Sequence, residues 1–94
     1  MILFPPKQYL SVYPNPTTTS IIAEYQINDL QNVHIYLTDF SGKIVKEFKV
    51  DHPTKGINYQ QINFDNKLSQ GLYYIILRTG SEVFTKKVVY QQRY

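Results

Sequence analysis

The hexapeptide Val33-His34-Ile35-Tyr36-Leu37-Thr38 places an aliphatic side chain at every second position. On an extended chain Val33, Ile35 and Leu37 share one face, whereas the shorter angular step of a helix would distribute them around its axis. The same alternation recurs in two further stretches, as Ile21, Ala23, Tyr25 and Ile27 and as Tyr73, Ile75 and Leu77. This period predicts strands with one buried face.

Glycine and proline mark the ends of the remaining segments. The turn-forming residues all fall between apolar runs, where the backbone needs a positive or a fixed φ; they are Gly42, Gly56, Gly71, Gly80, Pro14, Pro16 and Pro53. The predicted strands are Tyr9–Tyr13, Ser20–Ile27, Val33–Phe40, Lys43–Val50, Ile57–Phe64, Leu72–Thr79 and Val83–Tyr90. Short strands joined by turns, without a helical period, predict an all-β fold: a seven-stranded antiparallel β-sandwich of the immunoglobulin-like kind.

Two short connections are predicted to close hairpins. Asp39-Phe40-Ser41-Gly42 begins with an acceptor side chain and ends with glycine, which suits a type I turn followed by a left-handed residue. Thr79-Gly80-Ser81-Glu82 is the second candidate. Lys43–Val50 alternates less cleanly because Lys46 interrupts its apolar phase, so we expect a bulge or an edge position there.

Length and composition fit one folded domain with one core, since the chain has 94 residues, of which 43% are hydrophobic. We expect residues 1–8 to be a linker stub and residues 9–94 to be the domain. The net charge of +3 is uneven: residues 1–42 hold one Lys against three acids, and residues 43–94 hold nine Lys or Arg against four. The lack of cysteine excludes disulfides and thiolate metal sites. No stretch has the length of a secretory leader or a transmembrane segment.

The sequence predicts neither an enzyme nor a cofactor. His34 and His52 lie in different segments without the spacing of metal ligands, and we expect His34 on the polar face of a strand. The carboxylates stand singly, and Asp39 and Asp65 are interpreted as turn acceptors. No phosphate-binding loop and no RNA-binding aromatic motif occurs, so we expect no small-molecule substrate and no nucleic acid.

Tyr36 and Tyr74 lie out of phase with the aliphatic positions, so their rings are expected on an outer face. Such rings leave open a second interpretation, a carbohydrate-binding or adhesive β-sandwich module that stacks tyrosine on sugars. The plainer interpretation is that scattered exposed aromatic residues have no function of their own.

Four motifs, taken in order, resemble one family. They are Leu10-Ser11-Val12-Tyr13-Pro14-Asn15-Pro16-Thr17, Asp39-Phe40-Ser41-Gly42-Lys43-Ile44-Val45, Leu68-Ser69-Gln70-Gly71-Leu72-Tyr73-Tyr74-Ile75-Ile76-Leu77 and Lys86-Lys87-Val88-Val89. Over residues 9–91 the chain resembles the type A C-terminal sorting domain of proteins that Bacteroidetes export by type IX secretion. The resemblance implies a non-catalytic signal that directs a larger cargo across the outer membrane, for cleavage and attachment at the cell surface.

The resemblance also implies partners and site residues. The partners would be the outer-membrane translocon and a sortase-like peptidase that cuts near residues 1–8. The family motifs map onto Pro14, Asn15 and Pro16, onto Asp39 and Gly42, onto Gly71 and Tyr73, and onto Lys87, Val88 and Val89. Residues 90–94 form a longer tail than family members generally have, and we expect the chain to be the end of a longer precursor.

The last predicted strand has a particular role in this interpretation. A terminal strand at a sheet edge offers unpaired N–H and C=O groups to which a receptor can add a strand of its own. We expect Lys86–Tyr90 to be that edge, with the two lysines Lys86 and Lys87 guarding it against self-pairing. The sequence leaves the strand order, the cargo and the oligomeric state open.

Overall fold

The computed structural model describes residues 7–65, 67–80 and 82–92, and within them the chain forms strands and no helix. The strands are β1 (Tyr9–Tyr13), β2 (Ser20–Ile27), β3 (Val33–Asp39), β4 (Ile44–Val50), β5 (Gly56–Asn63), β6 (Gly71–Arg78) and β7 (Val83–Tyr90). The all-β prediction with seven strands is therefore confirmed. Six predicted boundaries, in four strands, are off by one residue. The starts of β5 and β6 move because Gly56 and Gly71 already pair with Ile27 and Tyr90 as the first residues of their strands.

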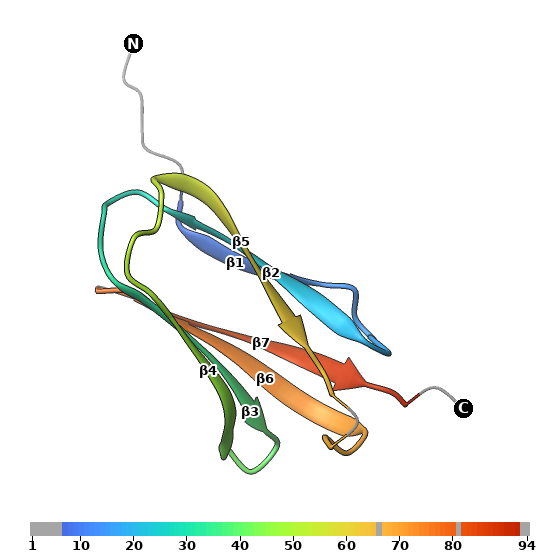
Figure 1. Ribbon diagram of the computed structural model, residues 1–94. Coiled ribbons are helices and arrows are strands. Elements are labelled where there is room, and N and C mark those ends of the chain that lie inside the picture. The colour runs from blue at the N-terminus through green and yellow to red at the C-terminus, as the bar shows by residue number, and fades with distance from the viewer. Residues whose placement is uncertain (1–6, 66, 81, 93–94) are drawn as a thin grey trace.

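The strands form two antiparallel sheets that pack face to face (Figure 1). One sheet has the order β1-β2-β5 and the other the order β4-β3-β6-β7. The hairpins β1-β2, β3-β4 and β6-β7 stay within a sheet, whereas the connections β2-β3, β4-β5 and β5-β6 cross from one sheet to the other. This arrangement agrees with the predicted immunoglobulin-like sandwich.

The core lies between the sheets and contains every residue that the alternation selected, together with buried residues of other segments. The most deeply buried side chains are Ile21, Tyr25, Ile27, Val33, Ile35, Leu37, Ile62, Ile75, Leu77 and Val88. Burial of each aliphatic side chain stabilises the fold by about 1.5–3 kcal/mol, so these residues supply the main driving force for folding.

Strand β4 carries the irregularity that its sequence suggested. Leu37 pairs with Lys46 and Thr38 pairs with Ile44, so Val45 is an extra residue in the ladder. β4 is also an edge strand, so both expectations for this segment are confirmed. Lys46 lies on the inner side of this edge, where its ammonium donates a hydrogen bond to the Asn63 carbonyl.

Asp39 organises the β3-β4 turn. Its Oδ1 accepts hydrogen bonds from the Ser41 N–H at 2.9 Å, the Ser41 hydroxyl at 2.6 Å and the Lys43 N–H at 3.0 Å. The Gly42 N–H donates to the Asp39 carbonyl at 3.0 Å, and Gly42 has a φ of 92°. The structure thus confirms a tight turn closed by a left-handed glycine.

Candidate recognition site at one end of the sandwich

The four sequence motifs meet at one end of the molecule. Asp39 pairs with Tyr73 where β3 ends and β6 begins, and Gly71 pairs with Tyr90 where β7 ends. Thr17 forms an isolated parallel bridge with the same Tyr90. The start of β1 lies at the opposite end of the sandwich (Figure 1). Residues from widely separated parts of the sequence therefore form one surface.

Asn15 connects the first motif to the last. Its side-chain amide donates to the Lys87 carbonyl at 3.1 Å, and its Oδ1 accepts from the Val89 N–H at 2.9 Å. Asn15 stands between two prolines, each preceded by a cis peptide bond. Because one amide side chain satisfies both backbone groups, it replaces a neighbouring strand at this point of β7.

Thr17 continues the same contact along the chain. The Thr17 N–H donates to the Val89 carbonyl at 2.9 Å, and the Gln91 N–H donates to the Thr17 carbonyl at 2.8 Å. Together with Asn15, Thr17 occupies the outer backbone groups from the Lys87 carbonyl to the Gln91 N–H. We call this set of four hydrogen bonds the Asn15–Thr17 clip.

An aromatic cluster supports the same end from inside. Phe64, which follows β5, stacks on Tyr90 of the other sheet with ring centroids 4.7 Å apart. Tyr73 meets Phe64 edge-on at 5.3 Å, and its hydroxyl donates to the Ser69 carbonyl at 2.6 Å. A tyrosine at the start of this strand that bonds the backbone a few residues upstream is a tyrosine corner, a known feature of immunoglobulin-like sandwiches. Burial raises the pKa of Tyr73, so its hydroxyl stays protonated and remains a donor.

The motif residues divide into exposed and buried sets. Exposed or half-exposed are Pro14, Asn15, Pro16, Asp39, Gly42, Gly71, Lys87 and Val89. Tyr73 and Val88 are buried in the core, so their side chains offer a partner almost no surface in the folded domain. A shallow hollow of about 160 Å³ lies between Asp39 and Gly71, next to the exposed ring of Phe40.

A tyrosine–carboxylate cluster on the outer face of the β1-β2-β5 sheet was not anticipated from the sequence. The Tyr9 hydroxyl donates to Glu24 at 2.6 Å and the Tyr13 hydroxyl donates to the same carboxylate at 2.8 Å. The hydrogen bond to Glu24 raises the pKa of Tyr9 to about 12, and the two hydroxyls lower the pKa of Glu24. Tyr9 and Tyr13 share a strand face, but their meeting with Glu24 depends on the β1-β2 register.

Comparison with known families identifies the chain. The family model described as the secretion system C-terminal sorting domain matches residues 11–91. The chain belongs to this family. Its members are the C-terminal sorting signals of proteins that the type IX system exports to the cell surface or outside the cell, and they are in general not catalytic. The sequence matches no curated protein with significant similarity.

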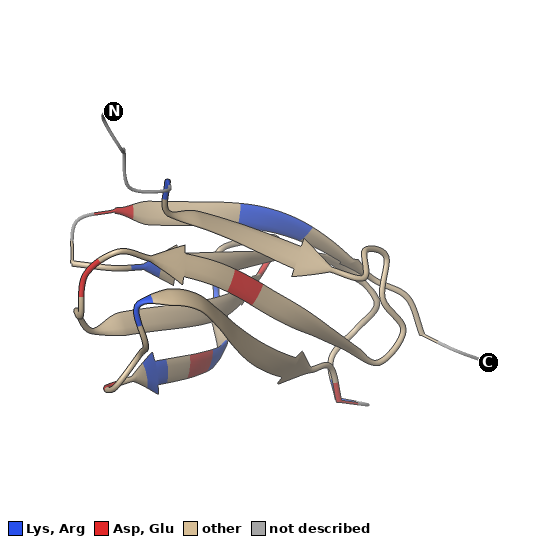
Figure 2. Ribbon diagram, turned by 90° about the horizontal axis from the view of Figure 1, so that it is seen from above, with Lys and Arg blue, Asp and Glu red and all other residues tan. Residues whose placement is uncertain are grey.

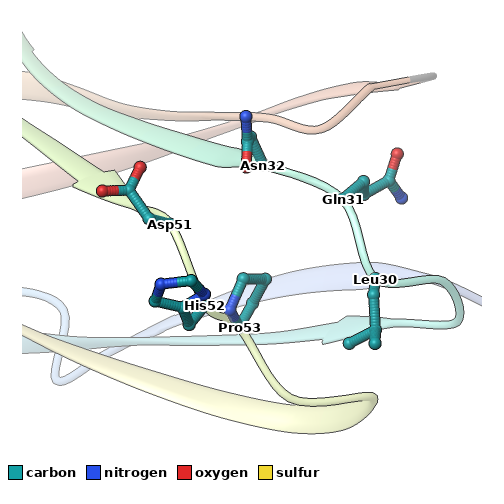
Figure 3. A pocket seen from close by; sticks show the side chains of 6 residues that line it. All are labelled: Leu30, Gln31, Asn32, Asp51, His52 and Pro53. Atoms are coloured by element: carbon teal, nitrogen blue, oxygen red, sulfur yellow. The ribbon is translucent and has the colours of Figure 1, made fainter.

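The sorting domain has a second hollow, of about 270 Å³, at the other end of the sandwich (Figure 3). It is lined by Leu30, Gln31, Asn32, Asp51, His52 and Pro53, which come from the β2-β3 and β4-β5 connections. The Asp51 and Gln31 side chains point away from each other (Figure 3). None of the sorting-motif residues lies in this hollow. Within the described residues no group of three or more His, Cys, Asp or Glu side chains is placed to hold a metal ion.

The outer face of the β4-β3-β6-β7 sheet carries Tyr36 and Tyr74, and both rings are half-buried in the sorting domain. Tyr36 pairs with Ile76, and its hydroxyl lies 2.9 Å from Nδ1 of His34, which occupies the same outer face as expected. Lys, Arg, Asp and Glu positions are spread over several strands and loops and do not form one continuous patch (Figure 2). Among the residues described here, no helix is long and apolar enough to cross a membrane.

Proposed function

We propose that the type IX translocon recognises the sorting domain at the end of the sandwich where the four motifs meet. The observation that carries this proposal is the Asn15–Thr17 clip, because it joins the first motif to the terminal Lys87-Val88-Val89 motif across more than seventy positions of sequence. A receptor that reads this surface reads the folded domain and not a linear peptide. The signal would therefore report that the domain has folded.

Within this surface we assign two kinds of role. Pro14, Asn15, Pro16, Asp39, Gly42, Gly71, Lys87 and Val89 would form the contact surface, because they are exposed or half-exposed. Tyr73 and Val88 would act indirectly, because their buried side chains hold β6 and β7 in place. Substitutions of these two residues are expected to reduce export by unfolding the domain.

We also propose that the sortase-like peptidase cuts within residues 1–8, ahead of the folded domain 9–94. Residues 1–6 lie outside the described residues, and Gln8 already contacts the fold by accepting a hydrogen bond from the Asn28 N–H at 3.0 Å. β1 starts at the end of the sandwich opposite the proposed recognition surface (Figure 1). The peptidase and the translocon would then approach different ends of the domain.

We infer that the domain itself is a ligand and not an enzyme. Glu24 and Asp39 are both engaged in structural hydrogen bonds, with tyrosine hydroxyls and with turn backbone respectively. The Tyr9 and Tyr13 hydroxyls lower the pKa of Glu24. The Ser41 hydroxyl and then the turn backbone lower the pKa of Asp39, whereas a general acid needs a raised pKa.

The test is export of a reporter protein that carries a secretory leader at its start and this chain at its end. The host is a bacterium with a type IX system, compared with the same host lacking the translocon. Truncation of residues 86–94 is unsuitable because it removes the core residues Val88 and Tyr90. We therefore use Asn15→Ala and Lys87→Ala, with Asn32→Ala and Lys49→Ala as matched exposed controls outside the recognition surface.

We expect the parent fusion to reach the surface or medium only in the host with the translocon. Asn15→Ala and Lys87→Ala should lower that export several-fold, and the two control variants should not. Export without the translocon would refute the sorting function. Parent-level export of both Asn15→Ala and Lys87→Ala would instead refute the proposed surface.

A further inference from the structure

Strand β7 is the edge of its sheet, and its outer backbone groups can be assigned one by one. Among the described strands β6 alone neighbours β7, so every second residue of β7 turns its N–H and C=O away from the sheet. The clip bonds the carbonyl of Lys87 and both groups of Val89, which shows which residues face outward. Counting back by two, Thr85 and Val83 face outward as well.

The outer edge of β7 is therefore divided into two parts. The closed part runs from the Lys87 carbonyl to Gln91 and is occupied by Asn15 and Thr17. The open part comprises the N–H and C=O of Val83 and Thr85 and the N–H of Lys87. No described residue outside β7 bonds these groups. The expected edge Lys86–Tyr90 is thus largely covered, and the backbone groups without a described hydrogen-bond partner lie further toward the start of the strand. Just before that start, the Gln8 side-chain amide donates to the Glu82 carboxylate.

The charges on β7 indicate what kind of strand the open part accepts. Lys86 pairs with the core residue Ile75, so its side chain lies on the face of the sheet that points toward the core. At this edge position the side chain is nevertheless exposed. The Lys87 side chain lies on the opposite, outer face of the sheet. Residues 83–90 contain no Asp or Glu. Two copies that paired antiparallel through this edge would bring their lysines together, which is unfavourable. An inward-pointing lysine on an edge strand is a known device against such self-pairing.

We infer that the open edge Val83–Lys87 is the docking site for an extended segment of a partner protein that carries an acidic side chain. The segment would add to the sheet as an extra strand, with its backbone bonded to Val83, Thr85 and the Lys87 N–H. Its carboxylate would face Lys86 or Lys87. This inference rests on the proposed function and adds the mode of recognition: backbone pairing at the open edge beside the clip.

The test compares Thr85→Pro with Thr85→Val in the reporter fusion. The Thr85 N–H faces outward, so proline there removes a donor that β6 does not use, and proline is tolerated on an edge strand in this orientation. Valine removes the hydroxyl and keeps the N–H. We expect Thr85→Pro to lower export about tenfold, as for one lost backbone hydrogen bond with its neighbours disturbed, and Thr85→Val to be exported like the parent.

Thermal unfolding of both purified variants verifies that they are folded. If Thr85→Pro does not fold, the charge test replaces it: Lys86→Glu with Lys87→Glu should abolish export, while Lys86→Arg with Lys87→Arg should retain it. Parent-level export of Thr85→Pro or of the double Glu variant overturns the inference, as does equal loss in Thr85→Val. A dimer of the purified chain that dissociates on the Thr85→Pro substitution also overturns the inference, because the edge would then pair with a second copy of the chain. In each case the sorting function is judged separately, by whether the parent fusion is exported only in the host with the translocon.

Discussion

At the scale of single residues, the domain depends on polar side chains that replace backbone partners. Asn15 supplies a donor and an acceptor to β7, and Asp39 supplies one oxygen to three donors in its turn. Glu24 accepts two tyrosine hydroxyls on a sheet face. Each of these groups is at or near the surface, so it contributes to stability by fixing local geometry more than by burying apolar surface.

The Glu24 cluster makes stability depend on pH in two windows. The folded pKa of Glu24 is lowered, so its contribution is present above its ordinary value and is lost as the pH falls through the folded value. The folded pKa of Tyr9 is raised to about 12, so its contribution is present below the ordinary value of 10.0 and is lost as the pH rises toward 12.

The melting temperature measured from pH 3 to pH 12 is expected to fall at both ends of the range. Glu24→Gln should flatten both slopes, because it removes the carboxylate that couples the two groups. Asp39→Asn serves as the control, since it should change the acidic slope and leave the Tyr9–Glu24 contribution to the alkaline slope in place. Identical alkaline profiles for the parent and Glu24→Gln would contradict the assignment.

At the scale of elements, the two edges of the β4-β3-β6-β7 sheet are protected in different ways. β4 has a bulge at Val45 and an inward-facing Lys46, whereas β7 has the clip at its end and an inward-facing Lys86. Both features discourage the edge of one molecule from pairing with the edge of another. The bulge was predictable because Lys46 breaks the apolar phase of its segment, but the clip was not, because Pro14-Asn15-Pro16 reads locally as a turn.

The β3-β4 hairpin offers a test of the turn assignment. Gly42 has a φ of 92°, and a Cβ there would meet no atom within 4 Å, so backbone conformation alone opposes a side chain. Gly42→Ala should lower the free energy of unfolding by about 1 kcal/mol, and Gly42→Asn should lower it less because asparagine tolerates the left-handed region. Urea denaturation followed by circular dichroism measures both, and an alanine variant as stable as the parent would be the contrary result.

At the scale of the whole molecule, the two sheets are joined at the recognition end by the stacked rings of Phe64 and Tyr90. Tyr90 is 3% exposed and is the last residue of β7, so the final strand completes the core as well as the proposed signal. Integrity of the fold and presentation of the signal are therefore coupled in one residue.

Tyr90→Ala is expected to lower the free energy of unfolding by about 3–5 kcal/mol, as for a large aromatic side chain removed from a core. Against a total of about 5–15 kcal/mol for a typical domain, this would bring the domain close to unfolding. Tyr90→Phe keeps the ring and is the control, with stability near that of the parent. Urea titration of the two variants distinguishes them, and equal midpoints would show that the stacked pair does not join the sheets.

The sequence by itself determined the seven strands, the buried alternating residues, the Asp39–Gly42 turn and the resemblance to the sorting-domain family. These features depend on neighbours a few positions apart, where side-chain period and glycine conformation act directly. Only the tertiary structure decided the strand order, the cluster around Glu24 and the closure of half the β7 edge. The bonds from Asn15 to β7 span 72 and 74 positions, and no local preference encodes a contact that exists only once both sheets have formed.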